Sequence, residues 1–278
     1  MANSKIIGAG QDTARRAPKT NTITCGDCLE VMQTIPDKSV DMILCDLPYG
    51  VTQNKWDSTI PLSDLWFQYN RVVKLSGPTV LFGQDKFSAR VMLSNEKYHK
   101  YNLIWNKVLI SGFLNANRMP LRTHEDIMVF YREQPVYNPQ KTVGTKSHSK
   151  GRMQTETNNN YGIYGKVDNA EINGEMKHPV SIVTFQKPHP SKAVHPTEKP
   201  VELMEWLIRT YTNEGYTVLD NCIGSGTTAI ACINTGRNYI GIEKEEKYCR
   251  IAEERIHALR SPAQNIAESA KNSIQQAE

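Results

Sequence analysis

The sequence predicts an α/β fold built on a mixed, mostly parallel sheet, and three observations support this prediction. Short apolar segments that end in turn residues alternate with segments whose apolar residues recur at helical spacing. A glycine-rich turn, residues 220–228, links a predicted strand to a predicted helix. Acidic residues follow four strands, namely Asp27, Asp46, Asp220 and Glu243. Because open α/β sheets bind ligands beyond the carboxyl ends of their strands, we expect these four side chains to face one edge.

Residues 21–131 hold most of the predicted strands, which lie at 22–25, 40–45, 79–82, 101–106 and 127–131. A helix is predicted over 62–73, where apolar residues recur at helical spacing, and Ser76-Gly77-Pro78 ends it. The connection 107–126 between the last two strands is too short for a parallel crossover with a well-formed helix. These two strands are therefore predicted to pair antiparallel, which gives the sheet one antiparallel strand.

Residues 132–196 differ in composition from the rest of the chain, because Asn, Gly, Pro, Lys, Tyr and Ser dominate there. Two interpretations stay open for this segment. It is either a solvated insertion or a recognition element, and long structureless stretches are uncommon inside compact domains. Regular structure is predicted to resume at Pro200.

Residues 197–260 are predicted to alternate helices and strands. Helices are expected over 201–211, over 227–235 and over about 248–259, and strands over 217–220 and 238–243. The polar residues 1–20 are predicted to form a loose arm, and residues 261–278 a polar tail that is mobile or weakly helical.

The composition is that of an ordinary globular protein, with 278 residues, a formal net charge of +4 and a pI near 8.6. A mildly basic balance is compatible with a polyanionic partner, although many proteins without one share it. No stretch approaches a transmembrane span and no apolar signal region begins the chain, so we expect a cytoplasmic protein without a membrane partner. The six cysteines are expected to be reduced, and Cys25-x-x-Cys28 has no accompanying ligand pair, so no metal is expected.

The glycine-rich turn, Gly224-x-Gly226-x-x-Ala229, matches the general nucleotide-binding fingerprint together with Glu243 on the next strand. Glycines permit a tight turn, the helix amino terminus attracts an anion, and a carboxylate accepts ribose hydroxyl protons. NAD, FAD and S-adenosylmethionine sites all use this pattern. A dinucleotide fold that starts at residue 217 would need several further units after Glu243, so strands from earlier in the sequence must complete the sheet. Two ligands would then lie side by side, as in a transferase.

The segment Asp46-Leu47-Pro48-Tyr49 follows an apolar strand and combines groups suited to a planar base that carries an amine. The lone pair of such an amine is delocalised into the ring. A carboxylate at Asp46 and the carbonyl of Leu47 can each accept an N–H, which draws the nitrogen towards tetrahedral geometry. Tyr49 can stack on the base. A base inside a duplex cannot enter such a pocket, so it would be flipped out.

The type, order and spacing of these motifs resemble the amino-methylating DNA methyltransferases of the permuted (β) order, over about residues 22–257. The resemblance implies a Rossmann-like S-adenosylmethionine-dependent methyltransferase fold with a circularly permuted order. Asp46 to Tyr49 resemble its catalytic motif, and His195 to Pro200 resemble the segment beside the methionine carboxylate of the donor. The implied cofactor-binding residues are Asp27, Cys28, Thr197, Lys199, Asp220, Cys222, Gly224, Ser225, Gly226, Thr227 and Glu243.

Two departures from the family pattern stand out. Leu47 replaces the usual first proline, although its carbonyl remains and Pro48 still favours an extended conformation at this position. Asn221-Cys222 replaces the usual Pro-Phe before the glycines, so apolar packing against the donor is weaker or remade there. An aspartate at the head of the catalytic motif favours adenine over cytosine in this family.

The resemblance implies that the protein methylates adenine at specific sites in double-stranded DNA, and it makes a homodimer plausible. Expected phosphate contacts are Lys141, Lys146, Lys150, Arg152 and a second group formed by Lys107, Arg118 and Arg122; expected stacking residues are Trp56 and Tyr161. Three alternatives stay open: transfer to cytosine N4 or to RNA, an NAD-dependent oxidoreductase, and a non-catalytic DNA-binding protein.

Overall fold

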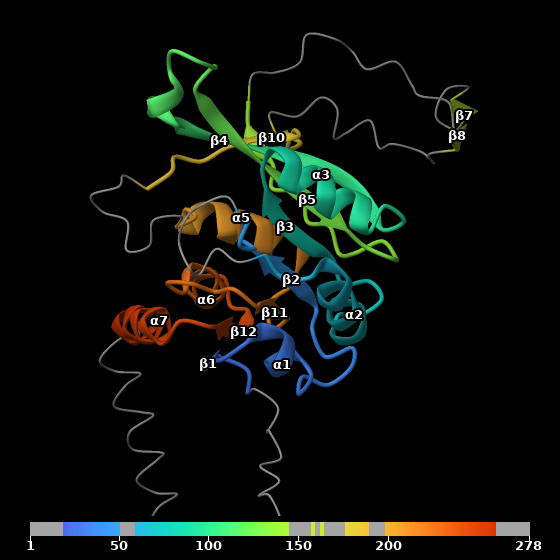
Figure 1. The fold of residues 1–278 in the computed structure, drawn as a ribbon. Helices are drawn as coiled ribbons and strands as arrows, with labels where there is room; N and C mark the ends of the chain where they lie inside the picture. Colours follow the sequence, from blue (N-terminus) through green and yellow to red (C-terminus); the bar gives the residue numbers. More distant parts are fainter. Residues whose placement is uncertain are drawn as a thin grey trace, which may run out of the picture.

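The computed structural model describes residues 19–50, 59–144, 157–158, 162–163, 176–188 and 198–259. Its centre is an eight-stranded sheet with the order β1-β12-β11-β2-β3-β5-β4-β10 (Figure 1). The strands are β1 (Thr22–Cys25), β2 (Met42–Cys45), β3 (Thr79–Gly83), β4 (His99–Ser111), β5 (Arg122–Phe130), β10 (Ile182–Thr184), β11 (Thr217–Asp220) and β12 (Asn238–Glu243).

Strand β5 runs antiparallel to both of its neighbours, β3 and β4, while every other pair in this sheet is parallel. The predicted α/β fold with one antiparallel strand in a mixed sheet is therefore confirmed. The central strands β2 and β3 are buried along their whole length, as expected for strands covered on both faces.

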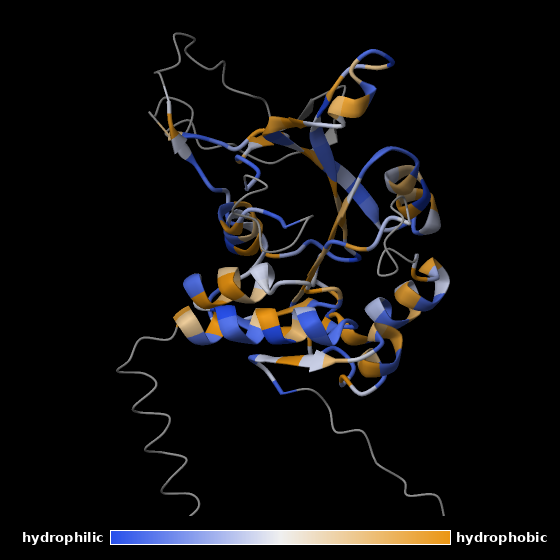
Figure 2. Ribbon diagram, turned by 60° about the vertical axis from the view of Figure 1, so that its left-hand side comes forward, coloured by the Kyte–Doolittle hydropathy of each residue, from blue (hydrophilic) through white to orange (hydrophobic). Residues whose placement is uncertain are grey.

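Helices cover both faces of the sheet (Figure 1). One face carries α1 (Cys28–Met32), α2 (Leu62–Val72) and α3 (Asp85–Ser94), and the other carries α5 (Val201–Tyr211), α6 (Thr227–Asn234) and α7 (Glu246–Leu259). Figure 2 shows hydrophobic and hydrophilic residues along the same helices, as expected for helices that bury one side. No helix in the described ranges has the length and apolar character needed to cross a membrane.

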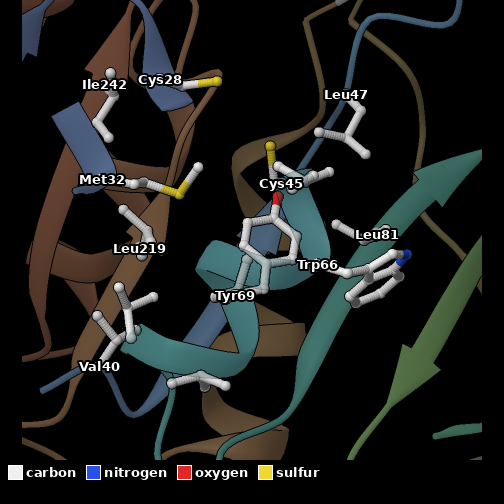
Figure 3. Packing of buried hydrophobic residues seen from close by; sticks show 14 of the residues in the cluster. Cys28, Met32, Val40, Cys45, Leu47, Trp66, Tyr69, Leu81, Leu219 and Ile242 are labelled. Carbon is white, nitrogen blue, oxygen red and sulfur yellow. The ribbon is translucent and has the colours of Figure 1, made fainter. Parts of the chain in front are cut away.

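Two hydrophobic clusters form the core, one on each face of the sheet. In the cluster beneath α1 and α2, Met32, Leu219 and Tyr69 pack around the sheet (Figure 3). The Tyr69 hydroxyl leaves this apolar environment and donates to Asn221 Oδ1 at 2.5 Å. The core thus anchors the loop that follows β11.

Several elements differ from the sequence predictions. The short α1 and the helix α3 were not predicted; α1 spans five residues, too few to show helical periodicity. Regular structure also resumes before Pro200, because β10 pairs with β4 and so joins the main sheet from within the region 132–196.

The same region contributes short strands outside the main sheet. These are β6 (Thr142–Val143), which pairs with β9 (Met176–Lys177), and β7 (Thr157–Asn158), which pairs with β8 (Gly162–Ile163). A 3-10 turn, Phe113–Asn115, lies in the connection between β4 and β5.

The expectation that all six cysteines are reduced is wrong for one pair, because Cys25 and Cys249 form a disulfide. Cys25 ends β1 and Cys249 lies in α7, which packs beside β1, so the fold brings together two residues that are 224 positions apart. The remaining cysteines, Cys28, Cys45, Cys222 and Cys232, are free thiols.

Candidate functional site

A cavity of about 370 Å³ opens at the carboxyl ends of the central strands, and both predicted motifs line it. Asp46 and Tyr49 lie on its wall together with Gly224 and Glu243. The turn that carries the tyrosine and the turn that carries the glycines therefore share one cavity rather than lying at opposite ends of the sheet. Its volume falls within the usual range for small-molecule sites.

Asp46 forms the hydrogen-bonding centre of one half of the cavity. Its Oδ1 accepts from the Tyr49 hydroxyl at 2.9 Å, and its Oδ2 accepts from the ammonium of Lys199. Burial raises the pKa of Asp46, and the positive charge of Lys199 opposes that rise. Each carboxylate oxygen has a second lone pair, so Asp46 can still accept from a ligand.

The rest of the catalytic motif is held by apolar contacts. The Tyr49 ring stacks on Phe87, with ring centroids 4.7 Å apart. The Leu47 side chain is buried in the cluster beneath α1 and α2 and points into it from the chain that follows β2 (Figure 3). Pro48 and Leu47 both contribute to the cavity wall. Packing of the leucine supplies rigidity at the position where the family usually has a proline.

Glu243, at the end of β12, holds the glycine-rich turn. Its Oε2 accepts from the backbone N–H of Gly224 at 2.8 Å, and its Oε1 accepts from the N–H of Glu245 at 2.9 Å. Gly226 precedes α6 with φ 87°, where an added Cβ would lie 2.9 Å from the Cβ of Ala252. Glycine is therefore required at this position both by the backbone conformation and by the close helix α7.

Asp27 and Cys28 lie where β1 passes into α1, and both line the cavity. Asp27 caps α1, because its Oδ1 accepts from the N–H of Leu29 at 3.0 Å. Its other oxygen lies 3.7 Å from Lys244 Nζ. Cys28 is buried, and a hydrogen bond with Cys222 lowers the pKa of its thiol.

Ser225 and Thr227 are fixed from two other elements, α7 and the residues before α5. Arg255 donates to the carbonyl of Ser225 at 2.7 Å and to its Oγ at 2.8 Å. The Thr227 hydroxyl donates to Glu198 Oε1 at 3.3 Å, and Arg255 forms an ion pair with the same carboxylate. Arg255 and Glu198 thus hold the turn before α6 in place.

Asp220 ends β11 and is only 4% exposed. Its carboxylate accepts from the Thr228 hydroxyl and, at 3.1 Å, from the N–H of Cys222. Burial raises the pKa of Asp220 from the usual 3.8 to about 6. The folded protein therefore keeps a proton that the unfolded chain has already released, so the free energy of unfolding falls as the pH rises from about 4 to about 6.

Replacing Asp220 by asparagine is expected to remove this pH dependence. The difference between 3.8 and about 6 corresponds to about 3 kcal/mol. The introduced amide can keep the accepted bond from Cys222 and donate to Thr228, whose hydroxyl reverses. Denaturant unfolding should therefore show Asp220→Asn gaining stability relative to the wild type as the pH rises from about 4 to about 7. Asp64→Asn, at an exposed carboxylate in the first turn of α2, should show no such trend; a constant difference for Asp220→Asn would contradict the assignment.

Lys199 lies in the half of the cavity that holds Asp46. Its side chain is 7% exposed, and its ammonium contacts Asp46 and lies 3.4 Å from Glu125 Oε2. The contact with a donor carboxylate that the resemblance implies for Lys199 stays a prediction.

Sequence reasoning missed several residues of this site. Glu125 on β5 and Trp105 on β4 line the cavity, and Lys107 forms an ion pair with Glu125 at 3.2 Å. The signal was present in the sequence: Lys107 and Glu125 are charged residues in strands with buried apolar neighbours. Lys107 was expected to contact phosphate, but it is 2% exposed and bound to Glu125, so that expectation is wrong.

Other expected contacts have mixed outcomes. Arg122 forms an ion pair with Asp85 and donates to Gln84. Arg118 and Lys141 lie in the described ranges, and their contact with DNA stays a prediction. The expected residues outside the described ranges are Thr197, Trp56, Tyr161, Lys146, Lys150 and Arg152.

Comparisons with solved structures identify the same fold in methyltransferases. The chain is 26% identical to M1.HpyAVI in a complex with SAM; the match covers 84% of this chain and 98% of that one and gives a TM-score of 0.55. The PvuII DNA methyltransferase, described as cytosine-N4-specific, is 16% identical with a TM-score of 0.62, covering 95% of this chain and 97% of that one. At that identity the second likeness shows the fold alone.

Sequence comparisons agree with this result. The type II methyltransferase M.HinfI of Haemophilus influenzae is 28% identical over 265 residues, which cover 88% of this chain and 71% of that protein. The family model N6_N4_Mtase, described as DNA methylase, matches residues 40–254. That match spans both motifs and most of the chain, and the protein belongs to this DNA methylase family.

Proposed function

We propose that this protein transfers a methyl group from S-adenosylmethionine to the N6 amine of adenine at specific sites in double-stranded DNA. The observation that carries the proposal is the single cavity shared by the Asp46 turn and the glycine-rich turn. Family membership supports DNA as the acceptor, and relatives whose structures were determined with the donor support S-adenosylmethionine. The oxidoreductase alternative receives no support from these comparisons.

The chemistry of the cavity fits the donor. Glu243 offers carboxylate lone pairs for the ribose hydroxyls, and the amino terminus of α6 offers a positive dipole for the methionine carboxylate. In this proposal Asp27, Cys28, Asp220 and Cys222 line the remainder of the donor site, with Ser225 and Thr227 in the turn. When bound, the donor supplies an electrophilic methyl group on a sulfonium.

Asp46 and the carbonyl of Leu47 would grip the two N–H groups of the target amine. Both acceptors favour a tetrahedral nitrogen, whose lone pair then points at the methyl carbon. In the transfer step the N–C bond forms as the S–C bond breaks. The amine becomes acidic only as its new bond forms, and its proton then passes to Asp46 or to water. Much of the acceleration comes from holding the two reactants in line.

Adenine is favoured over cytosine by the aspartate that heads the motif Asp46-Leu47-Pro48-Tyr49. In the same proposal the chain order is the permuted one, since the catalytic motif precedes the glycine-rich turn. The region 132–196 would recognise the target sequence. A homodimer and a cytoplasmic location stay predictions.

Single-molecule mapping of modified bases in DNA from cells that express the chain tests this proposal. We expect N6-methyladenine at one short sequence motif, and none in cells with the empty vector. N4-methylcytosine at a single motif would instead establish the cytosine alternative. Absence of any modified base, together with binding of S-adenosylhomocysteine, would support a non-catalytic DNA-binding protein.

A further inference from the structure

A row of alternating charges runs from Asp46 into the sheet. The ammonium of Lys199 contacts Asp46 and lies 3.4 Å from Glu125 Oε2. The other oxygen of Glu125 accepts from Lys107 Nζ at 3.2 Å, and Lys107 also donates to Ser111 Oγ at 3.2 Å. Two carboxylates and two ammonium groups therefore alternate without a net charge.

This row is buried. The side chains of Lys107, Lys199 and Glu125 are 3%, 7% and 14% exposed. The Lys199 ammonium lies 5.0 Å from the ring centroid of Phe82 and 6.0 Å from that of Trp105. Burying charges costs free energy, and apolar residues of similar volume often give equal or greater stability. A buried charged row beside a reactive pocket therefore calls for a role other than stability.

The edge of an amine-bearing base suggests that role. Adenine presents the N6 amine, a donor, beside the ring nitrogen N1, an acceptor, and cytosine presents N4 beside N3 in the same way. Asp46 is an acceptor and Lys199 is a donor that contacts it directly. The pair is thus complementary to the amine and ring nitrogen of either base.

We propose that Lys199 donates a hydrogen bond to the ring nitrogen next to the target amine, and that Glu125, held by Lys107, is the positioning residue for Lys199. The inference rests on the proposed function, because it assumes that the target amine binds at Asp46. It gives Lys199 a role on the acceptor base, different from the donor contact that the resemblance implies.

The bonding capacity of Lys199 is sufficient for this role. An ammonium group has three N–H donors. One of them binds Asp46, and the ion pair with Glu125, whose Oε2 lies 3.4 Å away, orients a second one towards that carboxylate. The third N–H can reach a base because Lys199 and Asp46 both line the cavity. Glu125, on strand β5, attracts the ammonium of Lys199 electrostatically. This attraction keeps Lys199 in place when Asp46 binds the amine of the target base.

The same pair rejects bases that carry a keto group at this edge. Thymine and guanine present a carbonyl oxygen beside a ring N–H. Their oxygen would face the Asp46 carboxylate, and their N–H would face the ammonium of Lys199. Leaving buried polar groups unpaired in this way is costly, so the pair selects amino bases before any chemistry takes place.

The test compares a duplex carrying the mapped methylation motif with one in which 1-deazaadenine replaces the target adenine. This analogue keeps the amine and replaces N1 by C–H. We expect the wild type to lose methyl-transfer efficiency, kcat/KM, on the analogue. The penalty of the analogue is the ratio of kcat/KM on adenine to kcat/KM on 1-deazaadenine. This ratio should be about 10- to 100-fold smaller in Lys199→Met than in the wild type, since the variant already lacks the hydrogen bond to N1. For a cytosine target, 3-deazacytosine replaces 1-deazaadenine.

Two further variants sharpen the comparison. Glu125→Gln should reduce the penalty of the analogue in the same direction, and it keeps the test decisive if Lys199→Met fails to fold. Lys187→Met, at another lysine of the cavity wall, should keep the wild-type penalty. Equal penalties in the wild type, Lys199→Met and Glu125→Gln would overturn the inference. A wild type that methylates no duplex would instead overturn the proposed function.

Discussion

Replacing Asp46 by asparagine is expected to lower kcat for methyl transfer by about a thousandfold while the affinity for S-adenosylhomocysteine changes little. In the proposed mechanism the carboxylate accepts from the target amine and can take its proton, and both contributions weaken when one oxygen becomes an NH2 group. Lys199 would also exchange a charged acceptor for a neutral amide oxygen, because the introduced amide can turn its single oxygen towards the ammonium and its NH2 group towards the Tyr49 hydroxyl. Transfer of labelled methyl to DNA carrying the mapped motif measures the rate, and calorimetry measures the affinity.

The control for this prediction is Asp64→Asn, at an exposed carboxylate in the first turn of α2. It should leave both quantities at the wild-type value. Thermal unfolding of Asp46→Asn shows whether the fold survives the change. A variant that folds and still transfers methyl at more than a tenth of the wild-type rate would remove Asp46 from the proposed mechanism.

Replacing Glu243 by glutamine is expected to weaken binding of S-adenosylmethionine by about a hundredfold. Both carboxylate oxygens already accept backbone N–H groups, from Gly224 and from Glu245. Glutamine has one acceptor oxygen, so one of these N–H groups would face its NH2 group, and the ribose hydroxyls would lose the charged acceptor. Hydrogen bonds to a charged group contribute about 1.5–3 kcal/mol each.

Calorimetric titration with S-adenosylmethionine and S-adenosylhomocysteine measures this effect. Glu246→Gln, at a side chain that is 80% exposed, serves as the matched control and should bind as the wild type does. If Glu243→Gln binds the donor within a factor of three of the wild type, Glu243 does not hold the ribose. The glycine turn would then be positioned by other groups, such as Arg255 on Ser225.

The sequence was sufficient to predict most of the sheet. Continuous apolar runs indicated β2 and β3, and the short connection between β4 and β5 indicated their antiparallel pairing. Short or weakly patterned elements were not predicted, among them α1 with five residues and β10 with three. Helix α1 has a local cap at Asp27 but too few residues to show helical periodicity, whereas β10 forms by pairing with the distant strand β4.

The disulfide likewise could not be predicted from local sequence patterns. Cys25 and Cys249 meet only because α7 packs beside β1, and no local pattern connects two positions that far apart. Tyr69 is another case: it was expected as one apolar residue of a helical stripe, yet its hydroxyl donates to Asn221 in the loop that follows β11. The fold thus accommodates the departure from the usual proline at position 221.

The two turns of the site follow from local sequence, because the glycines, the proline and the residues at strand ends fix backbone shape locally and place each turn at the carboxyl edge of the sheet. The charges that meet behind Asp46 come together through folding alone. Lys199 lies 153 positions away in the chain, and Glu125 and Lys107 come from two other strands. Ion pairs form between side chains that packing brings within a few ångströms, and distance along the chain carries no information about that proximity.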